Sequence, residues 1–133
     1  MDSKLKHLDF IQGVINRLST NSFLLKGWSV VLVSALFALS AKDSEVSFVL
    51  LAYIPATVFW GLDGYFIAVE RTYRKLYDRI RVKDPEEIDF SMNIGDLQNG
   101  AKGWIKATFS KTLVPFHGSL LAAVTLVIVF QLQ

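Results

Sequence analysis

Three long apolar blocks constrain this chain more than any other feature. They cover residues 22–41, 46–69 and 112–130. About twenty helical residues extend about 30 Å, which matches the hydrocarbon thickness of a bilayer. Backbone polar groups inside a bilayer must be paired within the structure itself, so each block is expected to be a helix. The sequence therefore predicts an all-α integral membrane protein with three transmembrane helices.

The segments between the blocks determine how the spans are connected. The 133 residues have room for a single membrane domain, residues 1–133. The loop at 42–45 is so short that the first two spans must form an antiparallel hairpin. Residues 70–111 are polar and are expected to be cytoplasmic, beginning with a helical extension that Pro85 ends. Residues 1–21 have apolar side chains at helical spacing, which predicts an amphipathic helix on the membrane surface or packed under the bundle.

Lysine and arginine are distributed unevenly along the chain. Thirteen of the fourteen lie before or at the start of the first block, or between the second and third blocks, and only Lys42 lies on the other side. Because basic residues favour the cytoplasmic side, we expect a cytoplasmic N-terminus and a C-terminus outside. A signal peptide cleaved near Ala41 is the less favoured alternative, since a long polar region precedes the block and Lys26 interrupts it.

Ionisable residues occur inside the apolar blocks, where they are costly and commonly functional. Counted from the outer ends of their helices, Lys26 and Asp63 lie about 22–26 Å below the outer surface. His117 lies five residues into the third block from the inner side, at a similar level. We therefore predict that Lys26 pairs with Asp63 and that His117 lies close by. Two interpretations remain open: an ionic staple with Lys26 reaching toward the interface, or a part of a gate.

A polar stripe follows one face of the second span. Asp63, Glu70 and Tyr77 are seven residues apart, so they drift only slowly around the helix. A polar face needs water or a partner. In an assembly of several copies, Asp63 and Glu70 would form acidic rings that favour cations, or the stripe would seal a dry interface. Gly61 and Gly64 permit close approach of a neighbouring helix.

The extension after the second block is basic and contains aromatic residues. It is expected either to touch anionic lipid headgroups or to bind phosphates of a nucleotide or nucleic acid, with rings available for base stacking. The candidate ligand-binding residues are Arg74, Lys75, Arg79, Arg81, Lys83, Tyr73, Tyr77 and Trp104.

The sequence contains no motif of a known catalytic centre. There are no cysteines, and no HExxH motif accompanies the two histidines, His7 and His117. The run at 95–102 resembles a P-loop, but an extra residue separates its last glycine from Lys102 and no Ser or Thr follows. We therefore expect that the protein is not an enzyme and that it holds no metal or cofactor.

Three stretches resemble a known family. They are HLDFIQGVINR at 7–17 with NSFLLKGW at 21–28, and FWGLDGY at 59–65 with the basic helix after it. In these stretches the chain is similar to small membrane effectors of bacterial anti-phage defence pairs, in particular the Hailong type. The resemblance implies a homo-oligomeric ion channel in the bacterial inner membrane, for which we expect about four copies. It also implies a partner nucleotidyltransferase, whose short oligodeoxyadenylate product holds the channel shut until infection removes it.

The sequence thus leads to two functions of different classes. The first is a ligand-gated channel in which Asp63, Glu70, Lys26 and His117 form the pore or gate. The second is a small scaffold or adaptor subunit that docks a soluble protein through its basic cytoplasmic face. A subunit of a small transporter is a weaker third option, because no inverted repeat is visible.

Overall fold

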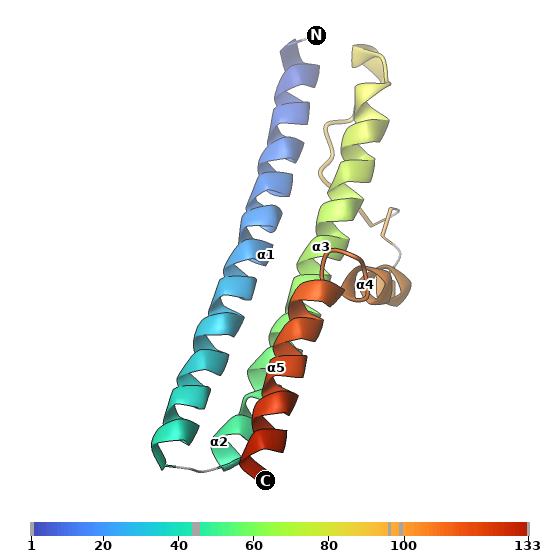
Figure 1. Ribbon diagram of the computed structural model, residues 1–133. Helices are drawn as coiled ribbons and strands as arrows, with labels where there is room; N and C mark the ends of the chain where they lie inside the picture. The colour runs from blue at the N-terminus through green and yellow to red at the C-terminus, as the bar shows by residue number, and fades with distance from the viewer. Residues whose placement is uncertain (1, 44–45, 96, 99, 133) are drawn as a thin grey trace.

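The computed structural model describes residues 2–43, 46–95, 97–98 and 100–132, and this part of the chain is helical with no strand (Figure 1). The helices are α1 (Asp2–Asp43), α2 (Val46–Leu51), α3 (Tyr53–Arg81), the 3-10 helix η1 (Pro85–Glu87), α4 (Gly100–Thr108) and α5 (Val114–Leu132). Three segments, namely α1, α2 with α3, and α5, are long and apolar enough to cross a membrane. The predicted all-α class with three such helices is confirmed.

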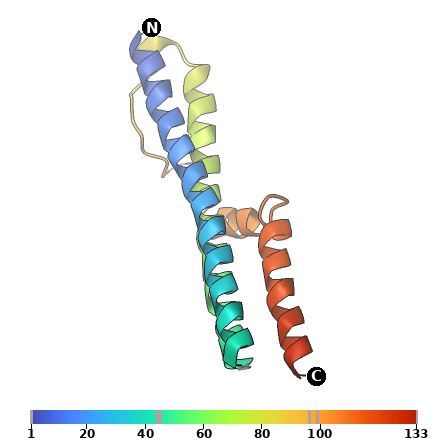
Figure 2. The same ribbon diagram turned by 60° about the vertical axis from the view of Figure 1, so that its left-hand side comes forward.

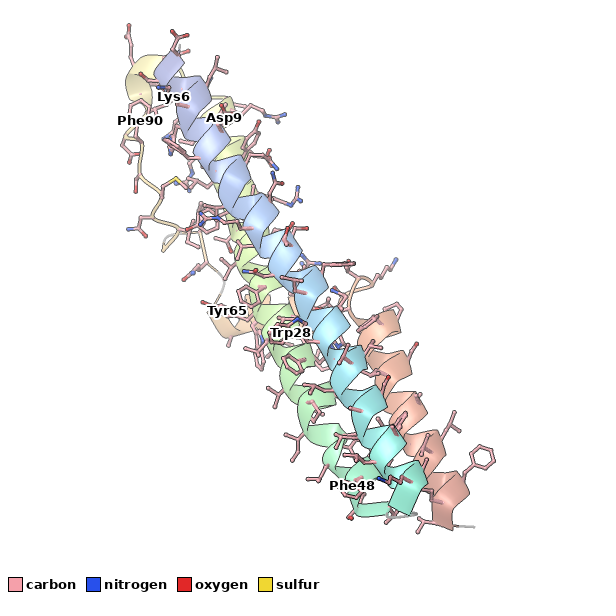
Figure 3. All side chains as sticks on the ribbon, turned by 90° about the vertical axis from the view of Figure 1, so that its left-hand side faces the viewer. Lys6, Asp9, Trp28, Phe48, Tyr65 and Phe90 are labelled. Atoms are coloured by element: carbon pink, nitrogen blue, oxygen red, sulfur yellow. The ribbon has the colours of Figure 1, made fainter. Side chains whose placement is uncertain are left out.

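Figures 1 and 2 show α1 and α3 side by side along the molecule, with α5 beside one half and α4 running across the long axis. We call residues 2–21 and 70–111 the charged half and residues 22–69 and 112–132 the apolar half. Lys6, Asp9 and Phe90 mark the end of the charged half in Figure 3, and Phe48 marks the opposite end.

The N-terminal residues do not form a separate helix. α1 is continuous over 42 residues, because no proline interrupts it between residues 1–21 and 22–41. Its first turns bury Ile11 and Ile15 against Leu76 and Ile80 at the end of α3. The amphipathic face predicted from spacing is therefore used against α3, so this segment does not turn aside to form a surface helix.

The second long segment is interrupted at one point. α2 ends at Leu51 and α3 begins at Tyr53, with Ala52 between them in a turn. Pro55 explains the position, because it has no N–H to donate to the carbonyl of Leu51 and its ring crowds that carbonyl.

α3 ends at Arg81, so the helical extension expected after the second block is present, and its end lies four residues before Pro85. Lys4 of α1 caps this end of the helix. Its ammonium donates to the carbonyls of Arg81 at 2.9 Å and Lys83 at 2.7 Å, where an ending helix leaves acceptors unpaired. Pro85 instead opens η1.

α4 packs closely across the middle of α3, next to the two glycines. A Cβ built on Gly64 would overlap Oγ1 of Thr108 and lie 3.1 Å from the Cα of the same residue. At Gly61 the nearest atom to such a Cβ, in the ring of Trp104, is 3.6 Å away. The close approach expected at these glycines is therefore made by α4, outside the three long segments.

We expect Gly64→Ala to destabilise the protein by about 1–3 kcal/mol, because the added methyl group forces α4 away from α3. Gly61→Ala is the matched control and should change stability by less than about 0.5 kcal/mol, since its Cβ makes an ordinary contact. Thermal unfolding of the purified proteins in detergent measures both. Equal melting temperatures for the two variants would contradict the packing.

Candidate functional site

One carboxylate joins three helices at the boundary between the two halves. Lys26 of α1 approaches Oδ2 of Asp63 on α3 at 2.6 Å, and Nε2 of His117 on α5 approaches the same oxygen at 2.8 Å. Ser22 of α1 donates to Oδ1. The predicted Lys26–Asp63 pair is present, and His117 contacts the same carboxylate. We call these four residues the ionic cluster.

The ionic cluster is sealed on one side and open on the other. Asp63 and His117 are fully buried, whereas the Lys26 side chain keeps 20% of its surface exposed. Lys26 also donates to Oγ of Ser22 at 2.9 Å. With Asp63 charged, Lys26 charged and His117 neutral, the cluster has no net charge, which is the state that a low-dielectric surrounding tolerates best.

The polar stripe of α3 faces into the chain. Asp63 contacts α1 and α5, Tyr77 packs on the apolar cluster beneath α1, and Glu70 is buried with Arg74 2.9 Å from its Oε1. The stripe thus finds its partners within one chain. An acidic ring of Asp63 and Glu70 around a pore would require α1 to separate from α3.

Trp60 connects the ionic cluster to α4. Its ring stacks on His117, with centroids 5.8 Å apart and planes at 6°. Its N–H donates to the carbonyl of Thr108 at 2.7 Å. Trp104 of α4 donates in return to the carbonyl of Gly61 at 2.9 Å. Two indoles therefore fasten α4 to α3, and one of them touches the cluster.

α5 is held to the rest of the chain by polar contacts at several levels. Beyond His117, the hydroxyls of Tyr53 and Thr125 are 2.7 Å apart, and Gln131 donates to Ser40 at 2.6 Å. Only His117 and Val124 are buried on this helix within the described residues. α5 is consequently the long helix with the fewest buried residues, and these hydrogen bonds add to the apolar packing of Val124 against Val33 and Val49.

The predicted ligand-binding residues do not form one site. Arg74 is paired with Glu70, Arg81 lies 3.9 Å from Asp78, and Arg79 and Lys83 line a separate groove near Asp89. The two tyrosines are partly buried against the apolar cluster of the charged half, so their rings are not free stacking platforms. Tyr73 also donates a long hydrogen bond to the carbonyl of Met92 at 3.5 Å.

Lys75 and Trp104 line the same pocket, which has a volume of about 360 Å³ and lies between α3 and α4. We call it the basic pocket. Its cations are Arg71, Lys75 and Lys106, and no Asp or Glu among the described residues lines it. Tyr65 and Trp104 contribute exposed ring surface, and Figure 3 shows Tyr65 on the outer side of α3. Cations with stackable rings suit a ligand that carries both phosphate and an aromatic base.

Sequence reasoning missed several members of these sites. Ser22 precedes Lys26 by four residues, and Arg71 precedes Lys75 by four, so helical spacing alone could have added both. Lys106 and Tyr65 had no such signal, because their meeting depends on α4 crossing α3. No group of three or more His, Cys, Asp and Glu side chains that could hold a metal occurs among the described residues.

Removal of one member of the Lys26–Asp63 pair should lower the stability of the protein more than removal of both members. We expect Lys26→Met to lower the free energy of unfolding by about 3–5 kcal/mol, because it leaves Asp63 charged and buried. The double variant Lys26→Met with Asp63→Leu should recover most of that loss. Unfolding in detergent by titration with dodecyl sulfate measures the cycle. Additive losses would show that the two side chains are not coupled.

Comparison with known proteins gives no match from which a function could be carried over. The chain matches no protein-family model, no curated protein and no solved structure. The basis for a function is then the chain's own arrangement, in which a buried ionic cluster at the head of α5 is joined through Trp60 to a basic pocket on α4.

Proposed function

We propose that the protein is a homo-oligomeric, ligand-gated ion channel of the bacterial inner membrane that acts as an effector in anti-phage defence. The charged half lies in the cytoplasm, and a nucleotide or short oligodeoxyadenylate binds there. The observation that carries the proposal is Trp60, because it contacts both the helix that walls the basic pocket and a member of the ionic cluster. A partner nucleotidyltransferase would supply the ligand.

Membrane insertion is supported by the surface of the apolar half. Large apolar side chains on all three long segments are strongly exposed, among them Val31, Ile54, Leu126 and Phe130. In water such a surface would be costly, whereas lipid or further copies of the chain would cover it. The excess of Lys and Arg in the charged half favours a cytoplasmic position for that half.

The ionic cluster serves in this proposal as the lock of the closed state. It joins α5, the least embedded helix, to α1 and α3 through one carboxylate. Opening requires α5 or α1 to leave Asp63, which then becomes available to water and to cations. Ligand in the basic pocket stabilises α4 in its crossing position and so keeps Trp60 stacked on His117. Loss of the ligand frees this contact.

The defining experiment is ion flux through liposomes that carry the purified protein, with and without a short oligodeoxyadenylate. We expect flux in its absence and suppression in its presence. Lack of flux in both conditions, from protein shown to be folded and oligomeric, would overturn the channel.

The lining of the basic pocket indicates which lysine of α4 contributes to ligand binding. Lys106→Gln should weaken oligodeoxyadenylate binding about tenfold, because the loss of one charge-assisted contact with phosphate has about this effect. Lys102→Gln is the control, since Lys102 is on the same helix but does not line the pocket. Binding is measured by fluorescence anisotropy at fixed salt concentration. Equal weakening by both variants would favour general attraction to the basic surface.

Trp60→Phe should separate binding from gating. The variant keeps an aromatic ring near His117 but loses the N–H that donates to Thr108. We expect nearly unchanged ligand affinity with weaker suppression of flux. Unchanged suppression would remove Trp60 from the coupling.

A second function is favoured by one observation, the apolar surface at the far end of the charged half. Leu5, Phe10, Val82 and Phe90 are exposed there, and a cleft of about 300 Å³ lies between Phe10, Phe90 and Met92. This end suits docking of a soluble protein, as expected of an adaptor subunit. A stoichiometric partner recovered from gently solubilised membranes, together with no flux, would favour the adaptor.

A further inference from the structure

A second cavity lies between α1 and α3 at the boundary of the two halves, and it is separate from the basic pocket. It has a volume of about 470 Å³ and is open at one side. Lys26 and Ser22 of the ionic cluster form part of its wall, Phe23 and Ile67 give it apolar surface, and Thr112 borders it just before α5. We call it the side hollow.

Unused hydrogen-bond donors converge on the side hollow. Among the residues that the structure describes, the guanidinium of Arg71 has no hydrogen-bond or ion-pair partner. Lys26 has three donors, of which Asp63 and Ser22 take two. Arg74 binds Glu70 through one nitrogen and has further N–H groups available. The hydroxyls of Ser19 and Thr112 complete the lining.

The balance of charge at the side hollow favours an anion. Glu70 is matched by Arg74 and Asp63 by Lys26, so Arg71 is left as the uncompensated charge. A phosphate diester has one negative charge and oxygens that accept several bonds at once, which fits one excess cation surrounded by hydroxyl and ammonium donors. A carboxylate-sized ion would leave part of the hollow unfilled.

The aromatic residues near the side hollow favour a lipid headgroup as the source of such a phosphate. Phe23 is 74% exposed at the rim, and Trp28, five residues further along α1 and labelled in Figure 3, is 63% exposed. Exposed aromatic residues at the edge of an apolar region are typical of the level of lipid headgroups. Acyl chains can follow the apolar half below, while the headgroup enters the hollow from the side. Basic pockets between membrane helices commonly bind such headgroups.

We infer that the side hollow binds the headgroup of an anionic glycerophospholipid, with its phosphodiester at Arg71 and Lys26 and its polar end at Thr112 and Ser19. This inference rests on the membrane insertion of the proposed function but not on channel activity. The bound lipid takes the third donor of Lys26 and so adjoins the ionic cluster directly.

The test is lipid retention by the purified protein. The protein is placed in nanodiscs of phosphatidylcholine with a minor share of phosphatidylglycerol, released in the gas phase, and weighed by native mass spectrometry. We expect phosphatidylglycerol to be enriched on the protein about tenfold over its share in the bilayer. Arg71→Gln should abolish most of this enrichment, and Thr112→Val should reduce it.

Lys75→Gln is the matched control, because it removes one positive charge a single turn away but lines only the basic pocket. Equal losses with Arg71→Gln and Lys75→Gln, or no preference for phosphatidylglycerol, would overturn the site. Displacement of the lipid by millimolar inorganic phosphate or glycerol phosphate would reassign the hollow to a soluble phosphate. Because no arm measures flux, the lipid site and the channel can fail separately.

Discussion

The carboxylate of Asp63 is the interaction on which the arrangement of the long helices depends. An isolated charge at that depth among apolar helices would be unstable, so the helices must bring donors to it. α1 brings Ser22 and Lys26, and α5 brings His117. This acidic residue therefore helps to set the register of α1 against α3 and the height at which α5 begins, together with the polar contacts at the helix ends. Apolar packing alone would allow these helices to slide past one another.

α4 extends this constraint to the charged half. It is too short to be stable alone, and its position across α3 depends on Gly64 and on the two reciprocal indole bonds. Because Trp60 takes part in one of these bonds and also stacks on His117, a movement of α4 changes the surroundings of the cluster. The same helix lines the basic pocket with Gly103, Trp104 and Lys106, so the ligand proposed for this pocket would contact the helix to which Trp60 is hydrogen-bonded.

The sequence predicts the long helices and the Lys26–Asp63 pair because both follow from one-dimensional quantities. Block length gives the helices, and residue counts from the block ends give the common depth of Lys26, Asp63 and His117. The basic pocket did not follow, since Lys106 and Tyr65 meet only through the crossing of α4. The tyrosines of the extension misled because their burial also depends on tertiary packing. Helical spacing puts Tyr73 and Tyr77 on a basic helix, but α1 and the segment that contains Ile88 and Ile94 pack against them.

Arg71 gives the proposed sites a common element. It lines both the basic pocket and the side hollow, and its guanidinium has no partner among the described residues. One guanidinium cannot bind a phosphate in each of two separate cavities equally well at the same time. In the proposed scheme, lipid in the hollow and a nucleotide in the pocket would compete for Arg71, and thermodynamic linkage would make this coupling equal in both directions. A bilayer rich in anionic lipid would then raise the ligand concentration that is needed to hold the ionic cluster closed.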